Sequence, residues 1–148
     1  MAWKIVMHGD RLGTDRLNVY SVVVETPEGV QRFRLGARPY LEIVASTNLK
    51  QRVRKTLEYT WADRLVYGVA GTPNRLEYDQ GFFVKLGDGA ADVKPIAGLY
   101  KTQVYALARH LGVIDGILQR EPTTDTYSLQ QSQEDFYFSV HYRLLDLI

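Results

Sequence analysis

Residues of the kinds that bind phosphate groups and metal ions gather in the middle of the chain. Carboxylates, lysines and small polar side chains alternate there with glycine-rich turns: Thr72, Asn74, Glu77, Lys85, Asp88, Asp92 and Lys101. Lysines neutralise phosphate charge, and a carboxylate such as Glu77 supplies the oxygen ligand that Mg²⁺ prefers. The residue types therefore favour a ligand site. Each residue alone also has an ordinary interpretation, because isolated loop charges are usually solvated and Thr72 could cap a helix.

Short motifs alone do not identify that ligand. Gly87-Asp88-Gly89 is first of all a turn signal, and neither of the glycine-rich phosphate-binding patterns occurs in the chain. The three histidines lie far apart without the spacing of a zinc site, and the chain has no cysteine. The sequence thus excludes a disulfide framework, thiolate catalysis and cysteine-ligated zinc.

The first part of the chain predicts β structure. Residues 17–24 and 30–35 are rich in β-branched and aromatic side chains and flank a turn around Pro27 and Gly29. A later apolar run, residues 65–70, ends at a Gly-Thr-Pro-Asn loop and predicts a strand buried on both faces. Ligands of open α/β sheets bind beyond the carboxyl ends of such strands, where Thr72 to Glu77 would lie.

Helical periodicity begins after residue 47. Apolar residues recur every four positions, at Leu49, Val53, Leu57 and Trp61. This predicts an amphipathic helix with Thr47 or Asn48 as its N-cap. Its basic residues suggest a solvated face or, alternatively, contact with an anion. They are Lys50, Arg52, Arg54 and Lys55.

The remaining segments complete an α/β pattern. Residues 81–98 are glycine-rich and aperiodic, which predicts an ordered loop over a site. A helix is expected over residues 100–111, ended by Gly112, and shorter helices over 115–120, 132–138 and 141–147. We expect one domain over residues 1–148, with a β-rich segment at 1–45 and the α/β portion at 46–148.

Size and charge describe an ordinary globular chain. It has 148 residues, 45% hydrophobic and 24% charged, and a formal net charge of +1. That balance argues against a broad surface for duplex nucleic acid. No apolar run reaches the roughly 18–20 residues of a membrane span, and the first residues lack the apolar core of a signal peptide. We expect a protein of the cytoplasm that binds neither nucleic acid nor membrane.

Five segments, taken in order, resemble the C-terminal half of ammonia-dependent NAD synthases. They are N-L-K-Q-R-V-R at 48–54, G-T-P-N-R-L-E-Y-D-Q-G-F-F-V-K-L-G-D-G at 71–89, A-D-V-K-P-I at 91–96, L-Y-K-T-Q-V at 99–104 and E-P-T at 121–123. Their order, spacing and residue types all match that family. The resemblance runs from about Asn48 to the C-terminus.

The resemblance implies a fold and a reaction. The family belongs to the ATP pyrophosphatase group, whose fold is Rossmann-like α/β, here partial or shortened. Its members are ligases that make NAD from nicotinic acid adenine dinucleotide in two steps. ATP adenylates the nicotinate carboxylate, and ammonia then displaces AMP. Mg²⁺ is the implied cofactor and a homodimer the implied assembly, with Tyr59, Trp61 and the helix of residues 50–55 as candidate interface features. No glutaminase domain is present, so free ammonia or ammonia from another chain would be the nitrogen source.

The resemblance also assigns roles to individual residues. On the nucleotide side, Thr72 would contact ATP, Lys101 the ATP phosphates, and Thr123 both ATP and Mg²⁺, with Glu77 as the second metal ligand. The site for the dinucleotide would be lined by Asn48, Arg52, Lys85 and Asp92. Lys85 and Asp92 would lie near the pyridine end and, with Lys101, take part in catalysis.

The sequence departs from the family in three places. It lacks the S-G-G-x-D-S loop that binds the pyrophosphate end of ATP, residues 1–45 show no resemblance to the family's nucleotide-binding half, and Leu76 replaces a small polar residue. A second hypothesis therefore stands beside the enzyme: a non-catalytic dinucleotide-binding or dimerisation module, or a fragment without that loop.

Overall fold

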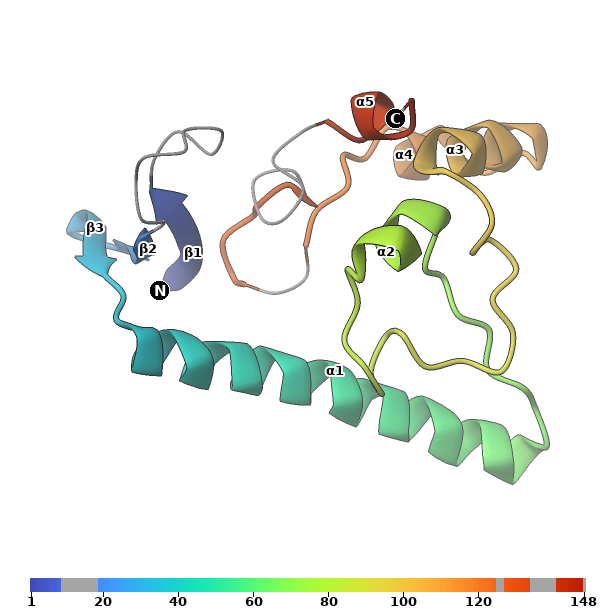
Figure 1. The fold of residues 1–148 in the computed structure, drawn as a ribbon, viewed down its shortest axis with the longest axis horizontal. Coiled ribbons are helices and arrows are strands. Elements are labelled where there is room, and N and C mark those ends of the chain that lie inside the picture. The colour runs from blue at the N-terminus through green and yellow to red at the C-terminus, as the bar shows by residue number, and fades with distance from the viewer. Residues whose placement is uncertain (9–18, 125–126, 134–140, 148) are drawn as a thin grey trace. The chain divides into compact units, whose positions relative to one another are not determined.

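The computed structural model describes residues 1–8, 19–124, 127–133 and 141–147. The chain divides into two compact units. The first comprises the described residues between 1 and 44 and between 121 and 140, and the second those between 45 and 120 and from 141 onward. The described part holds three strands and five helices, labelled in Figure 1. Their bounds are β1 Ala2–His8, β2 Val19–Thr26, β3 Gly29–Arg34, α1 Ala37–Leu65, α2 Arg75–Gln80, α3 Lys101–His110, α4 Asp115–Leu118 and α5 Tyr142–Leu145. The α/β class with a β-rich N-terminal portion is confirmed.

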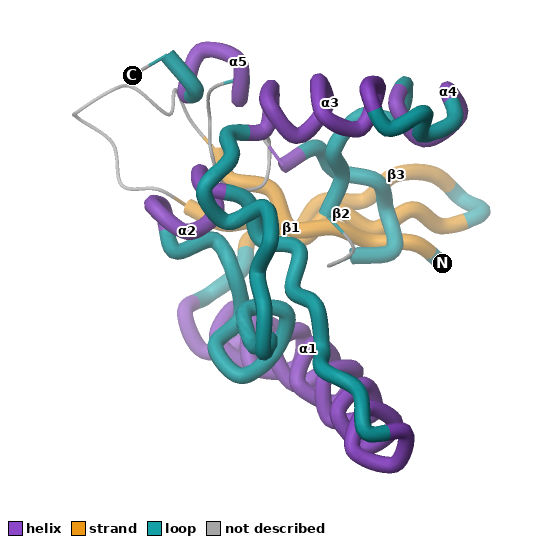
Figure 2. The backbone as a smooth tube through the Cα atoms, turned by 90° about the vertical axis from the view of Figure 1, so that its right-hand side faces the viewer, coloured by secondary structure: helices purple, strands orange, loops and turns teal. Residues whose placement is uncertain are grey.

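The strands form one antiparallel sheet in the order β1-β2-β3, drawn in orange in Figure 2. Ile5 lies opposite Val22, and Val22 opposite Phe33, so these side chains share one face of the sheet. The two predicted strands are confirmed as β2 and β3, and Gly29 between them has a positive φ of 129° that favours glycine. The sequence analysis missed β1, in which Ile5 and Val6 are the only β-branched residues.

Aromatic side chains cluster in the same unit as the sheet. The rings of Tyr20 and Tyr40 stack at 4.3 Å, and those of Trp3 and Tyr127 lie 4.9 Å apart. The backbone N–H of Trp3 donates to Ser128 Oγ at 2.8 Å, and the Leu129 N–H donates to the Trp3 carbonyl at 3.0 Å. Residues near 128 thus lie along β1.

Helix α1 is longer than the sequence analysis predicted. It begins at Ala37, so Thr47 and Asn48 lie inside the helix and the N-cap prediction is wrong. The preceding residues explain the earlier start, because Pro39 fits a first helical turn and no glycine or second proline follows before Thr47.

The apolar stripe of α1 faces outward. Its four predicted members are 50–59% exposed: Leu49, Val53, Leu57 and Trp61. The buried residues of the helix are Lys55 and Ala62, seven positions apart on another face. The amphipathic pattern is present, but within the described part of this chain the stripe has no covering element.

The predicted strand at residues 65–70 is wrong. Val66 and Tyr67 are 90% and 70% exposed, and only Val69 is buried. Ala70 makes a single parallel bridge with Val93, so the extended segment finds no strand to pair with in the described residues. An apolar run alone cannot supply that partner.

The later elements match the prediction more closely. Helix α3 ends where Gly112, with a φ of 74°, donates to the Arg109 carbonyl at 3.1 Å. Helices α4 and α5 confirm the short helices near 115 and 142, while the predicted helix at 132–138 lies almost entirely outside the described residues. No described helix has the length and apolar content needed to span a membrane.

Burial raises the pKa of Tyr40 and of Tyr127 to about 12 from the ordinary 10.0. As the pH rises, the unfolded chain therefore loses these phenol protons at a lower pH than the folded chain does. The free energy of unfolding that the protonated phenols contribute is complete below about pH 10 and is lost as the pH rises towards about 12. We expect Tyr40→Phe and Tyr127→Phe to flatten this alkaline loss of unfolding free energy, measured by urea denaturation at several pH values. Tyr67→Phe, at a 70% exposed position, is the control. Equal slopes in all four proteins would contradict the prediction.

Candidate functional site

The glycine-rich loop after α2 is a compact turn held by its own aspartate. Asp88 Oδ1 accepts the Val84 N–H at 2.8 Å, and the N–H groups of Gly87 and Gly89 donate to the Val84 carbonyl at 2.9 and 3.2 Å. Leu86, at the corner, has a positive φ of 61° and is 71% exposed. The turn reading of Gly87-Asp88-Gly89 is thus confirmed, and Asp88 stabilises the loop.

Helix α1 holds the same loop from the side. Arg52 Nε donates to the Lys85 carbonyl at 3.2 Å. This contact brings together two residues that the sequence analysis assigned to the dinucleotide site. Asn48 lies one helical turn before Arg52 in α1 and is half-buried. The three residues therefore belong to one stretch of α1 and the loop that it contacts.

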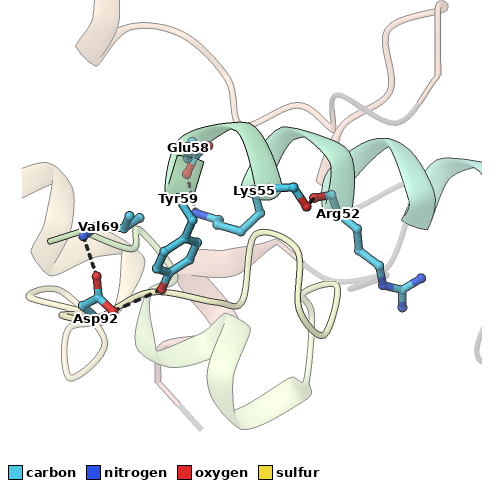
Figure 3. Close-up of polar contacts among 7 residues, drawn as sticks. Arg52, Lys55, Glu58, Tyr59, Val69 and Asp92 are labelled. Carbon is cyan, nitrogen blue, oxygen red and sulfur yellow. Dashed lines mark hydrogen bonds and ion pairs between the residues drawn. The ribbon is translucent and has the colours of Figure 1, made fainter. Parts of the chain in front are cut away.

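Asp92 ties the end of the loop to α1 and to the segment after it. Its Oδ2 accepts the Val69 N–H at 2.7 Å, and its Oδ1 accepts the Tyr59 hydroxyl at 3.3 Å (Figure 3). Burial, followed by the Asp92 charge, raises the pKa of Tyr59, which keeps this phenol a donor. The Gly71 N–H donates to the Val93 carbonyl at 2.8 Å and continues the connection. Asp92 is thus oriented by two donors while remaining exposed.

Helix α2 starts with a reciprocal cap formed by Asn74 and Glu77. The Glu77 N–H donates to Asn74 Oδ1 at 3.1 Å, and the Asn74 N–H donates to Glu77 Oε2 at 2.9 Å. The sequence analysis missed this helix, although Asn74-x-x-Glu77 is the signal of such a cap. The Arg75 N–H donates to the Leu99 carbonyl at 2.9 Å and brings the starts of α2 and α3 together.

This arrangement places a lysine against the capping carboxylate. Lys101 Nζ lies 3.5 Å from Glu77 Oε1, and both side chains are only 15% exposed. The structure therefore joins the two residues that the sequence analysis assigned to ATP phosphates and to Mg²⁺. Thr72 is exposed and lies two residues before Asn74. Thr123 belongs to the other unit, where it bridges to Ser132.

Glu77 has the donor chemistry for a metal that phosphates also hold. Among the described residues, no group of three or more acidic or histidine side chains is arranged to enclose a cation. Mg²⁺ at nucleotide sites commonly uses one or two carboxylates and takes its other ligands from phosphates and water. Glu77 Oε1 already faces a cationic group, so a single carboxylate of this kind fits such an ion.

We expect Gly89→Ala to destabilise the loop. A Cβ at position 89 would collide with the Phe83 ring, whereas a Cβ at Gly98 would meet nothing within 4 Å. The substitution should cost about 1–3 kcal/mol of unfolding free energy, the usual range for overpacking. Chemical denaturation with Gly98→Ala as the matched control measures it. A loss no larger than that of the control would show that the ring moves aside freely.

Comparison with known proteins identifies the family of the chain. The family model described as NAD synthase matches residues 14–148. The chain belongs to the NAD synthase family. It is 63% identical over 147 residues to the NH(3)-dependent NAD(+) synthetase of Rhizobium meliloti (strain 1021), covering 99% of this chain and 44% of that protein. It is 37% identical over 138 residues to the synthetase of the same name from Mycoplasma pneumoniae (strain ATCC 29342 / M129 / Subtype 1), covering 87% and 56%.

Two solved structures are also similar. An NMN synthetase from Francisella tularensis matches with a TM-score of 0.65 and 35% identity, over 70% of this chain and 44% of that one. An NH3-dependent NAD synthetase from Campylobacter jejuni, solved with a nitrate ion, matches with a TM-score of 0.50 and 30% identity, over 58% and 35%. The chain thus spans about half, or less, of the proteins it matches. The similarity to the R. meliloti protein extends through the β-rich segment, beyond the residues on which the sequence resemblance rests.

Proposed function

We propose that this chain serves the ATP-dependent amidation of nicotinic acid adenine dinucleotide to NAD, with ammonia as the nitrogen donor. The observation that carries the proposal is the partly buried Glu77–Lys101 pair, because it joins at 3.5 Å the two residues matched to the family's nucleotide motifs. The 63% identity to an NH(3)-dependent NAD(+) synthetase supports the same reaction.

On the nucleotide side, the chain supplies positive charge and one metal ligand. Lys101 binds the ATP phosphates, Thr72 contacts ATP, and Glu77 would hold Mg²⁺. The family resemblance assigns Thr123, in the other unit, to ATP and Mg²⁺ as well. Magnesium supplies additional positive charge against the triphosphate. The nicotinate carboxylate and the α-phosphate are both anionic, so their reaction requires this neutralisation, and most of the catalysis is positioning and electrostatic stabilisation.

On the dinucleotide side, the loop and α1 bind and orient the nicotinate end. Asn48 and Arg52 contribute from α1, and Lys85 and Asp92 from the loop. The Arg52 contact with the Lys85 backbone and the Tyr59 contact with Asp92 fix this side before substrate arrives. Ammonia then displaces AMP from the adenylated carboxylate. Because ATP is the cosubstrate, we also infer a cytoplasmic location. The formal net charge of +1 favours small-molecule partners over nucleic acid.

Amidation of nicotinic acid mononucleotide is a second candidate reaction. The structure with the TM-score of 0.65 is titled an NMN synthetase. The same carboxylate would be adenylated and amidated in both substrates, and only the adenylate half of the dinucleotide would be absent. The two reactions differ in their product, NMN or NAD, so one assay separates them.

The amidation assay tests both reactions with the whole chain. Purified protein receives ATP, Mg²⁺, ammonium and either nicotinate nucleotide, and NAD, NMN and AMP are counted by mass spectrometry. We expect Lys101→Ala to lower product formation about 10²–10³-fold, the effect of removing one electrostatic stabiliser. Arg109→Ala, which removes one positive charge from the exposed surface of α3, should leave turnover unchanged.

Circular dichroism spectra of both variants are compared with that of the wild type to check that they are folded. Equal turnover in a folded Lys101→Ala variant would overturn the role of Lys101. Binding of the dinucleotide without any release of AMP or pyrophosphate would instead support the non-catalytic module. If both variants formed product as fast as the wild type, catalysis would depend on other residues.

We also propose a homodimer whose contact includes the apolar stripe of α1. The four side chains of the stripe are each at least half exposed, which is unusual for a regular apolar row on a helix. A second copy would bury the row against its own equivalent, as two-fold dimers do.

We expect Leu57→Glu to shift the chain from dimer to monomer in analytical ultracentrifugation at micromolar concentration. The matched control is Leu111→Glu, because Leu111 is 70% exposed but lies beyond the end of α3, outside the stripe. A charge buried in the contact would be unpaired and would weaken association strongly. A dimer that survives Leu57→Glu, or that Leu111→Glu dissociates equally, would exclude the stripe as the contact.

A further inference from the structure

Glu77 presents its two carboxylate oxygens to two different donors. Oε2 accepts the Asn74 N–H at 2.9 Å and completes the cap of α2, while Oε1 lies 3.5 Å from Lys101 Nζ. The cap fixes the orientation of the carboxylate. A cation that neutralises Oε1 therefore approaches the same oxygen that the Lys101 ammonium now faces.

Burial makes such a cation necessary. Both side chains are 15% exposed, and a carboxylate at such a position is costly when its charge has no counterpart. A divalent ion and an ammonium group repel each other strongly at about 4 Å in a partly buried place. Either group neutralises Oε1, and each weakens the binding of the other at this oxygen.

We propose that Lys101 is the resident counter-ion of Glu77 and that a divalent cation replaces it there. When the metal binds Glu77 Oε1, the Lys101 ammonium leaves that oxygen, and the two events form a single exchange of cations. The inference rests on the proposed function, which makes Glu77 a magnesium ligand and Lys101 a phosphate-binding residue. The released ammonium becomes available to the phosphates of the nucleotide, so metal and nucleotide favour each other's binding.

Mn²⁺ binding to the whole chain without nucleotide tests the exchange. Free Mn²⁺ is measured by electron paramagnetic resonance in a titration. We expect Lys101→Met to bind Mn²⁺ about tenfold more tightly than the wild type, in the range of coupling between contacting residues. The double variant Lys101→Met with Glu77→Gln should lose this gain in Mn²⁺ affinity, because the glutamine amide is uncharged and does not attract the ion. Lys50→Met, which removes an exposed lysine, should bind Mn²⁺ as the wild type does.

A second measurement uses the wild-type chain, in case Lys101→Met weakens the fold. Acetylation of the Lys101 amine by acetic anhydride, which releases acetate, should become faster when Mn²⁺ is added, as measured by peptide mass spectrometry. Acetylation of Lys50 should not change. The exchange would be overturned if a folded Lys101→Met variant bound Mn²⁺ only as tightly as the wild type. It would also be overturned if Lys50→Met raised the Mn²⁺ affinity as much as Lys101→Met does, or if Mn²⁺ left the acetylation rate of Lys101 unchanged.

These results are separable from the amidation assay, because neither titration nor acetylation uses nucleotide or turnover. A chain that makes no NAD but shows the exchange would refute the proposed function alone. An active chain without the exchange would lose only the exchange.

Discussion

The need to neutralise a partly buried carboxylate governs the arrangement around α2 and α3. Glu77 caps its own helix and also faces Lys101, so one side chain fixes the start of α2 and the position of the first residue of α3. The Arg75 backbone contact with Leu99 reinforces the same junction. Removing either charge would leave the other without its counterpart, and such losses are expensive where water is scarce.

The other acidic residues of the site also have structural tasks. Asp88 holds the glycine-rich turn through the Val84 N–H, and Asp92 accepts the Val69 N–H and the Tyr59 hydroxyl. Each carboxylate satisfies a backbone donor that would otherwise need water. Of these two residues, the family resemblance assigns Asp92 to the dinucleotide site, so in the proposed function one carboxylate serves both the folded loop and the ligand.

The sequence predicted those elements whose signals are local. Gly112 ends α3, and the turn at Gly29 separates β2 from β3, because a positive φ requires a residue without a side chain. The sequence did not predict the elements whose structure depends on contacts with distant residues. The run at 65–70 has the composition of a strand, but among the described residues it pairs only at Val93. The start of α1 depends on the ten residues before its apparent N-cap. The Tyr59–Asp92 contact spans 33 residues and has no local signal. Motif order assigned the site residues, but only the structure shows which of them touch.

The exposed row on α1 has a thermodynamic consequence. In the homodimer that we propose, the second copy covers the row that is exposed in one copy, so part of the stabilising burial comes from association. The unfolding temperature of such a chain depends on its concentration, because dilution removes the covering copy by mass action. An unfolding temperature measured at a single concentration would then depend on the protein concentration as well as on the stability of the fold.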